Sequence, residues 1–305
     1  METNNITKPL VSVSTITYNH AKFIRKCIEG VLNQKVDFLI EYLIHDDCST
    51  DGTIDIIKEY AEKYPNIIKP IYEKENQYSK GGPWGSAVWN YPRAQGKYIA
   101  LCEGDDYWTD PLKLQKQVDF LESNPDYTCC FHCYLNNSIY TNNYYEPDAI
   151  KLIKESGNPV GLDLDVDLTF KRWVTMPMSQ MMRKDALDLN LVYKYKYYRD
   201  THEVYHLLKE GKGYLFGFVG GIRIMHEGGV ASMISNEENI NNSLKIAEEL
   251  YKINNDEFTR KYYVEILYWA LSNEKAWSLK RILYSTKEFL IDKRFWWYLK
   301  NIVRK

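Results

Sequence analysis

The chain has 305 residues, 45% of them hydrophobic and 26% charged, which excludes a disordered, collagen-like or disulfide-scaffold protein. Its 39 Lys and Arg residues against 41 Asp and Glu residues give a net charge of −2, so no chain-wide basic surface exists to bind nucleic acid through phosphates. No apolar run approaches the roughly 20 residues of a membrane span, and residues 1–10 lack the basic head and apolar core of a secretory signal, so we expect a cytoplasmic protein with six reduced cysteines.

Strand and helix patterns alternate along the first 135 residues. Runs of β-branched and apolar residues predict buried strands, and apolar positions three or four residues apart predict helices. In chain order the patterns predict strands at 10–17, 42–47, 67–73, 96–106 and 127–134, and helices at 20–33, 53–64 and 111–123. Because the two kinds of element alternate, we expect an α/β fold with a mostly parallel central sheet flanked by helices.

The rest of the chain has a less regular pattern. In order, it predicts a polar surface loop at 135–160, a strand and short helix at 175–190, a helix at 202–210, strands at 214–219 and 222–226, and helices from about residue 231 to the end. We therefore expect a C-terminal helical extension after the α/β part.

Two of the predicted strands end in a pair of acidic residues. Asp46–Asp47 closes the strand at 42–47, and Asp105–Asp106 closes the strand at 96–106. Ligands of largely parallel sheets bind beyond the carboxyl ends of the strands. Both acidic pairs should therefore face one cleft.

The glycine-rich loops that bind phosphates in two common nucleotide folds are missing, because neither G-x-x-x-x-G-K-[ST] nor G-x-G-x-x-G after a strand occurs. The segment GGPWG at 81–85 predicts only a flexible loop. A bound nucleoside diphosphate would need another counter-charge, for which a divalent metal held by Asp105–Asp106 is the obvious candidate. The same pair could instead cap the helix that starts near Pro111, and the residues alone leave both readings open.

Two short motifs point to zinc or redox chemistry. HEVYH at 202–206 satisfies the H-E-x-x-H signature of zinc proteases, with His202 and His206 one helical turn apart, but a third ligand is not evident. CFHC at 130–133 lies on a predicted strand, where its two cysteines point to opposite faces, so we interpret them as buried apolar residues. A zinc hydrolase remains the less favoured alternative.

Six segments together resemble family-2 glycosyltransferases with the GT-A fold. They are VSVSTITYNH (11–20), IHDDCSTDGT (44–53), ALCEGDDYW (100–108), TMPMSQMMRKDAL (175–187), YRDTHE (198–203) and IRIMHEGGVAS (222–232). Their order and spacing fit the family over about residues 8–232. The resemblance implies a catalytic domain at 1–230, with a nucleotide-sugar-binding half at 1–135 and an acceptor and catalytic half at 136–230, followed by a helical region at 231–305.

The resemblance implies a role for each acidic residue at the strand ends. Tyr18 would border or stack on the nucleotide base, and Asp47 would accept a hydrogen bond from the uracil imide, since a carboxylate only accepts. Asp46 would support the same loop, and Asp105 would lie near the ribose.

The resemblance also implies a divalent metal, Mn²⁺ or Mg²⁺. Asp106 would hold the metal at the diphosphate, and His226 would lie near the diphosphate or the metal. The competing interpretation of His226 is a histidine packed on a strand. A metal at this position would stabilise the charge that grows on the leaving diphosphate.

Asp200 matches the family's catalytic acid at the start of a helix and would take the proton from the acceptor hydroxyl. Glu203, one turn later, is the second candidate, and an N-cap is the competing interpretation of Asp200. The implied reaction is a single displacement that inverts the anomeric centre of a nucleotide-sugar, with a UDP-sugar as the expected donor. A non-catalytic nucleotide-sugar binding protein is the alternative from another class.

The implied acceptor is a glycan or a lipid-linked molecule in surface polysaccharide synthesis. Residues 280–305 contain eight Lys and Arg residues, two acidic residues and several aromatic residues. This composition suits either peripheral contact with an anionic membrane or packing of a helix, onto the catalytic domain or in a homodimer. The sequence leaves these two possibilities open.

Overall fold

Residues 8–81, 85–141, 143–227, 229 and 235–272 are described by the computed structural model. The chain divides into two compact units, residues 1–233 and 234–305. The first unit contains a mixed sheet, and its strands within the described residues are β1 (Val11–Thr17), β2 (Ile40–Asp46), β3 (Ile68–Tyr72), β4 (Tyr98–Leu101), β5 (Tyr107–Trp108), β6 (Tyr127–Ser138), β7 (Asn143–Tyr145), β8 (Gly161–Leu164), β9 (Met181–Arg183) and β10 (Lys212–Met225).

The sheet order is β3-β2-β1-β4-β9-β6-β10-β5, with β7 beside β6 and β8 beside β10. The long pairings are parallel: β1 pairs with β2 and β4, β2 with β3, and β6 with β10. The pairings that involve β5, β7, β8 and β9 are antiparallel and short. The expectation of a mostly parallel α/β sheet is therefore confirmed. The chain builds outward from β1 to β3 and then returns to place β4 on the other side of β1, which makes the β1–β4 edge a topological switch point.

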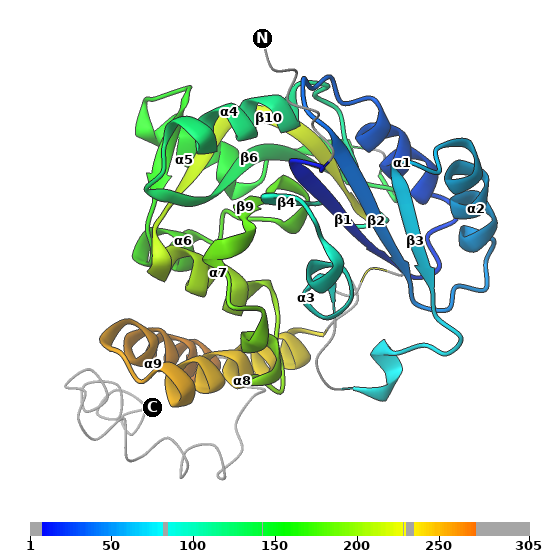
Figure 1. The fold of residues 1–305 in the computed structure, drawn as a ribbon. Coiled ribbons are helices and arrows are strands. Elements are labelled where there is room, and N and C mark those ends of the chain that lie inside the picture. Colours follow the sequence, from blue (N-terminus) through cyan, green and yellow to red (C-terminus); the bar gives the residue numbers. More distant parts are fainter. Residues whose placement is uncertain (1–7, 82–84, 142, 228, 230–234, 273–305) are drawn as a thin grey trace, which may run out of the picture. The chain divides into compact units, whose positions relative to one another are not determined.

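Helices pack along this sheet (Figure 1). α1 and α2 lie next to one another near β3, and α4 and α5 lie beside β6. α1 buries Ile24, Cys27, Ile28 and Val31, whose spacing of three and four residues places them on one face. The bounds are α1 (Ile24–Leu32), α2 (Thr53–Lys63), α3 (Ser86–Trp89), α4 (Lys113–Ser123), α5 (Asp148–Ser156), α6 (Val166–Arg172) and α7 (Asp200–Glu210), with 3₁₀ turns at Tyr78–Lys80, Tyr91–Arg93, Pro177–Ser179, Lys184–Ala186 and Leu189–Tyr193.

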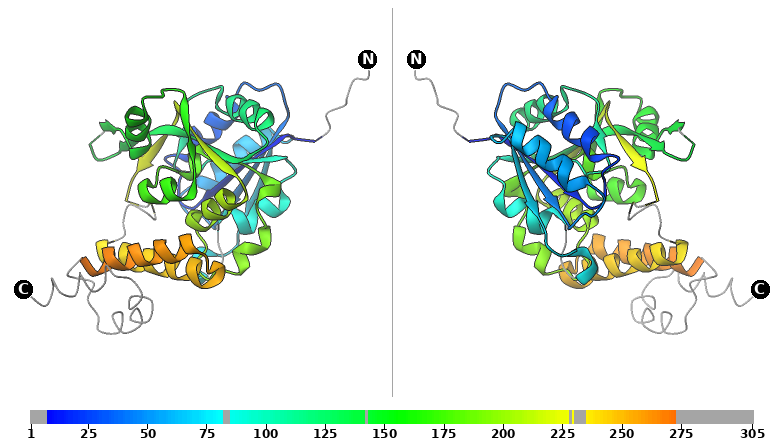
Figure 2. Two further views of the ribbon diagram at one scale, coloured as in Figure 1. Left: turned by 90° about the vertical axis from the view of Figure 1, so that its left-hand side faces the viewer. Right: turned by 90° about the vertical axis from the view of Figure 1, so that its right-hand side faces the viewer.

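The second unit contains a helical hairpin formed by α8 (Asn236–Asn254) and α9 (Glu257–Ser272), which run side by side (Figure 2). The Ser235 side chain caps the start of α8, and Asn255 ends it in the left-handed conformation. Ala247, Tyr263 and Leu267 form the buried cluster between the two helices. The predicted basic and aromatic segment at 280–305 lies outside the described residues. Within the described part, no helix combines the length and apolar character needed to cross a membrane.

Three expectations from the sequence were wrong in detail. The strand expected at 96–106 ends at Leu101, so the acidic residues after it lie in a turn. The surface loop expected at 135–160 instead contains the end of β6, β7 and α5, because the polar composition hides the apolar face of that helix. The strands expected at 214–219 and 222–226 form one strand, β10, whose register against β6 shifts around Val219.

Candidate active site

The turn between β4 and β5 brings three carboxylates together at the switch point of the sheet. Glu103, Asp105 and Asp106 lie close enough for one oxygen of each to fall within 4.8 Å of the others. Asp106 is buried, and its Oδ1 accepts the backbone N–H of Ile224 at 2.9 Å. That bond ties the acidic turn to the last residues of β10, which are about 120 positions later in the chain.

Two histidines face the same turn. His226 follows β10, and its Nε2 lies 3.0 Å from Asp105 Oδ2. His20 follows β1, and its Nε2 lies 3.9 Å from the same oxygen. The two imidazole rings meet edge to face with centroids 5.7 Å apart, and the Phe23 ring packs 4.6 Å from His226.

The crowding of negative charge makes the site electrostatically unusual. Burial, with the neighbouring Asp105 and Glu103, raises the pKa of Asp106 well above its ordinary value. Although the Glu103 side chain is exposed, the protein atoms that surround it, with Asp105 and Asp200, raise its pKa to about 8. Burial alone would raise the pKa of Asp105, but the hydrogen bond from His226 and the adjacent His20 outweigh burial and lower it.

These residues fit a divalent cation. Among the described residues, two groups of three potential ligands occur, and Asp105 belongs to both: His20, Asp105 and His226 form one, and Glu103, Asp105 and Asp106 form the other. The Nδ1 atom of His20 is buried and has no hydrogen-bond partner among the described residues. A cation next to these carboxylates would relieve the repulsion that raises the pKa of Asp106.

Asp200 occupies the first position of α7 and lies near the acidic turn. It is half-buried, burial raises its pKa, and its charge contributes to the raised pKa of Glu103. The positive charge of Arg223, on β10, opposes the raised pKa values of Asp200, Glu103 and Asp106. Arg199, not Asp200, is the N-cap residue of α7, and its backbone N–H donates to His202 Nδ1 at 3.0 Å. The competing interpretation of Asp200 keeps some support, because its Oδ1 accepts the first-turn backbone N–H of Thr201 at 2.8 Å.

Glu203 is only one turn away but occupies a different environment. Its side chain is buried, and Oε1 accepts a hydrogen bond from Gln180 Nε2 at 2.6 Å. Burial raises the pKa of Glu203 to about 7, although Gln180 and the hydroxyls of Tyr91 and Tyr198 offset part of the shift. This arrangement suits a residue that holds α7 against the segment just before β9.

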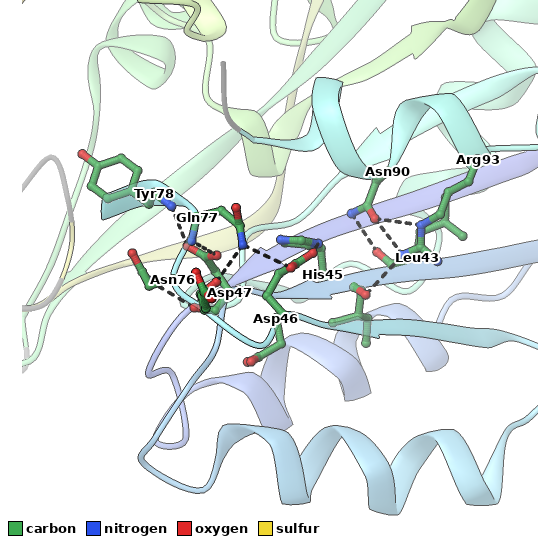
Figure 3. Close-up of polar contacts among 12 residues, drawn as sticks. Leu43, His45, Asp46, Asp47, Asn76, Gln77, Tyr78, Asn90 and Arg93 are labelled. Carbon is green, nitrogen blue, oxygen red and sulfur yellow. Dashed lines mark hydrogen bonds and ion pairs between the residues drawn. The ribbon is translucent and has the colours of Figure 1, made fainter. Parts of the chain in front are cut away.

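The acidic pair at the end of β2 supports two loops, and Figure 3 shows the contacts of Asp47 with one of them. Asp46 accepts the backbone N–H of Ser49 at 2.8 Å and its hydroxyl at 2.6 Å. The two oxygens of Asp47 accept the backbone N–H groups of Gln77 at 2.7 Å and Tyr78 at 3.0 Å. Asp47 is fully buried by these contacts, whereas Tyr18, at the end of β1, has an exposed side chain.

The zinc-protease alternative finds no support in the geometry. His202 is buried, and its Nδ1 accepts the Arg199 backbone N–H at 3.0 Å. His206 pairs with the Tyr195 hydroxyl at 2.7 Å. Neither histidine belongs to a three-ligand group among the described residues. The cysteines of CFHC are buried on β6, and all six cysteines of the chain are free thiols.

Two residues at the site, His20 and Arg223, were not singled out from the sequence as functional. His20 lies within the first family-like segment but carries no separate signal, whereas Glu103 forms the spaced acidic pair of EGDD with Asp105 but was given no role of its own. Arg223 lies three residues before His226, and this proximity to a proposed site residue is the only sequence signal that could have pointed to it. The pairing of β10 with β6 and β5 places it near the acidic turn, and the sequence does not reveal this pairing.

Comparison with protein families shows one match across most of the first unit. The model described as "Glycosyl transferase family 2" matches residues 12–191. A protein of Mycobacterium tuberculosis called uncharacterized protein Rv1520 is 45% identical over 122 residues, which are 40% of this chain and 34% of that protein. The putative teichuronic acid biosynthesis glycosyltransferase TuaG of Bacillus subtilis is 42% identical over 117 residues, 37% of this chain and 42% of TuaG. The matched region thus spans less than half of either relative.

Two solved structures share the fold. S. aureus TarS 1–349 in complex with UDP-GlcNAc aligns with a TM-score of 0.61 and 19% identity, over 84% of this chain and 71% of the other. The mannosyltransferase PcManGT from Pyrobaculum calidifontis, in complex with GDP-Man and Mn²⁺, aligns with a TM-score of 0.53 and 14% identity, over 95% and 83%. At these identities the likeness concerns the fold alone.

Proposed function

The chain belongs to glycosyl transferase family 2 and has the GT-A fold, and from this membership we propose that it is an inverting, metal-dependent glycosyltransferase that uses a UDP-sugar. The single observation that carries the proposal is the convergence of Asp105, Asp106, His226 and Asp200 near the carboxyl end of β4. This is the edge of the sheet where α/β proteins bind nucleotides. The UDP-GlcNAc bound to TarS supports the choice of donor nucleotide.

The uridine would lie beyond β1 and β2. Tyr18 is exposed at the end of β1 and offers its ring to the base. Asp47 is proposed to accept the uracil imide N–H. Because Asp47 is fully buried and both its oxygens accept backbone N–H groups, from Gln77 and Tyr78, this contact requires residues 77 and 78 to move aside when the nucleotide binds. Asp46 supports the adjoining loop through Ser49, and Asp105 borders the ribose and diphosphate.

Asp105, Asp106 and His226 would hold the divalent metal, Mn²⁺ or Mg²⁺. When bound there, the metal neutralises the charge that develops on the departing diphosphate. Asp106 is fixed for this purpose by the Ile224 N–H, and Asp105 by His226.

Asp200 acts as the general base. Its carboxylate accepts the proton of the acceptor hydroxyl while that oxygen attacks the anomeric carbon and the bond from that carbon to the diphosphate breaks. One displacement of this kind inverts the anomeric configuration. Glu203 is a positioning residue, because it is buried and bonded to Gln180.

The acceptor we propose is a hydroxyl of a glycan or lipid-linked molecule of a surface polysaccharide, made in the cytoplasm. The similarity to TuaG, named for teichuronic acid biosynthesis, supports this class of acceptor. The tail at 280–305 would then bring the enzyme to an anionic membrane surface.

A thermal-stability screen tests the donor assignment. Nucleotide-sugars with uridine, guanosine and thymidine would be added with Mn²⁺ or with EDTA. A donor present at about 100 times its Kd stabilises the fold by about 2.7 kcal/mol, which is easily measured. We expect a UDP-sugar to raise the melting temperature only with metal; stabilisation by no nucleotide-sugar would contradict the proposal.

A further inference from the structure

Three segments far apart in the chain place nitrogen and oxygen ligands around one point. His20 comes from the end of β1, Asp105 from the turn after β4, and His226 from the end of β10. One ligand atom of each lies within 4.8 Å of the others. Both Nε2 atoms face the same oxygen, Asp105 Oδ2, at 3.9 Å from His20 and 3.0 Å from His226.

The position of His20 is fixed by its backbone. Its N–H donates to Thr53 Oγ1 at 2.9 Å, and its carbonyl accepts the N–H groups of Phe23 and Ile24 at 2.8 Å each. These bonds hold the residue at the turn that leads into α1. The imidazole is thus presented to the acidic turn before any ligand binds, which reduces the ordering cost of binding.

The surroundings of the ring leave its Nε2 directed at the acidic turn. Nδ1 is buried against Gly104 and has no hydrogen-bond partner among the described residues. A Cβ on Gly104 would lie 2.9 Å from that nitrogen, so the glycine permits the close approach of the ring to the turn. Nε2 is the ring nitrogen that faces Asp105, so it is the atom that could bind a metal at the acidic turn.

We propose that His20 is a ligand of the divalent metal, which is therefore held by two imidazoles, from His20 and His226, with the Asp105 carboxylate between them. The role of this metal in sugar transfer rests on the proposed function, whereas the binding of the metal by His20 does not. Mg²⁺ prefers oxygen ligands and retained waters, whereas the affinity of nitrogen-containing sites for first-row divalent metals rises from Mn²⁺ through Co²⁺ to Cu²⁺, with Zn²⁺ also well suited to imidazole. The site should accordingly select a transition metal.

The experiment counts the imidazoles on the metal. Pulsed electron paramagnetic resonance of Mn²⁺ added alone to the full-length protein detects coupling to coordinated ¹⁴N. The same samples are titrated with Mn²⁺ and Mg²⁺ by calorimetry. The variants are His20→Gln, His226→Gln and, as the matched control, His206→Gln, whose imidazole pairs with Tyr195 away from the acidic turn.

We expect two coordinated imidazoles in the wild type and in His206→Gln, and one in each of the other variants. His20→Gln should also weaken Mn²⁺ binding at least about 10-fold, the scale on which ligand networks affect metal affinity, and should affect Mg²⁺ binding less. Fewer than two imidazoles in the wild-type protein would overturn the proposal whatever the variants do. An unchanged nitrogen signal in His20→Gln would overturn it as well.

A parallel transfer assay separates this inference from the proposed function. If the wild-type protein transfers sugar but its Mn²⁺ is coordinated by only one imidazole, the proposed role of His20 is rejected and the proposed glycosyltransferase function stands. If Mn²⁺ is coordinated by two imidazoles but no nucleotide is released from any donor, the role of His20 stands and the proposed glycosyltransferase function is rejected.

Discussion

Asp200 and Glu203 lie one turn apart on α7, yet their surroundings differ. Asp200 is half-buried and interacts electrostatically with Arg223 and with Glu103 of the acidic turn, whereas Glu203 is buried and accepts a hydrogen bond from Gln180. A general base must reach the acceptor hydroxyl, and only a carboxylate that borders the site can do so. The structure therefore favours Asp200 as the base.

The first prediction follows from this difference. Asp200→Asn should retain metal-dependent binding of the donor but lose transfer by roughly 10²-fold or more, the scale of general-base catalysis. Glu203→Gln is the matched variant and should stay within a few-fold of wild type in rate. Steady-state rates and donor affinity, measured on both variants, check the assignment; the opposite ranking would place the base one turn further along α7.

The second prediction concerns pH. Burial raises the pKa of Glu203 from 4.5 to about 7, so between these values the folded chain holds a proton that the unfolded chain has released. Stability should fall as the pH rises through this window and level off above it. The full contribution is on the order of 3 kcal/mol.

Glu203→Gln removes this titration, so the variant should gain stability relative to wild type between pH 5 and about pH 7.5. Urea unfolding at both pH values measures the difference. If the gap between variant and wild type is the same at both, the proton on Glu203 does not control stability.

At the scale of elements, Asp47 joins the end of β2 to the turn at Tyr78–Lys80. Asp47→Ala would leave the N–H groups of Gln77 and Tyr78 without their acceptor, at about 1–3 kcal/mol for each group that stays buried. Asp47→Asn keeps one carbonyl oxygen and should lose less. We expect lower stability in urea and faster proteolysis around residues 73–85, most strongly for alanine.

The same pair of variants tests the contact with uracil. A loss of preference for UDP over GDP, without any loss of stability, would show that Asp47 acts on the base and not on the loop. Both measurements use the same protein samples, so the two roles can be separated directly.

The strand and helix order of the N-terminal half follows from the sequence because each strand there is a short apolar run bounded by polar turns. The placement of Asp46–Asp47 and Asp105–Asp106 at the same edge of the sheet follows from topology, since β2 and β4 both pair in parallel with β1. The α/β fold class was predicted on this basis, whereas the family was predicted from the resemblance of six sequence segments, and both predictions are confirmed. The roles of the individual site residues stay predictions.

Other features depend on contacts that periodicity does not encode. α5 was missed because a polar stretch surrounds its buried residues Ala149, Leu152 and Ile153. The bond from Ile224 to Asp106 joins residues 118 positions apart and depends on the strand order. The burial of Asp47 depends on a turn 30 residues later, which no local pattern indicates.

At the scale of the whole molecule, the sheet and every proposed site residue lie in the first unit, residues 1–233. The tail at 280–305 has a strongly basic and aromatic composition. We expect the full-length protein to float with anionic vesicles at low salt and to be released as salt rises, because charge attraction is screened.

A chain truncated before Lys280 is the control for the flotation assay and should remain at the bottom of the gradient. Equal flotation of both chains, or of neither, would assign the tail to packing or to dimer formation instead of membrane contact.

The central claim is that this chain transfers a sugar from a nucleoside diphosphate with the help of a metal. The most direct measurement is the release of UDP from a panel of UDP-sugars, with Mn²⁺, with EDTA, and with EDTA followed by excess Mn²⁺. We predict release from at least one donor that EDTA abolishes, that Mn²⁺ restores, and that Asp200→Asn lowers by roughly 10²-fold. Release that is undiminished in EDTA, or no release of nucleotide from any sugar donor, would contradict the claim.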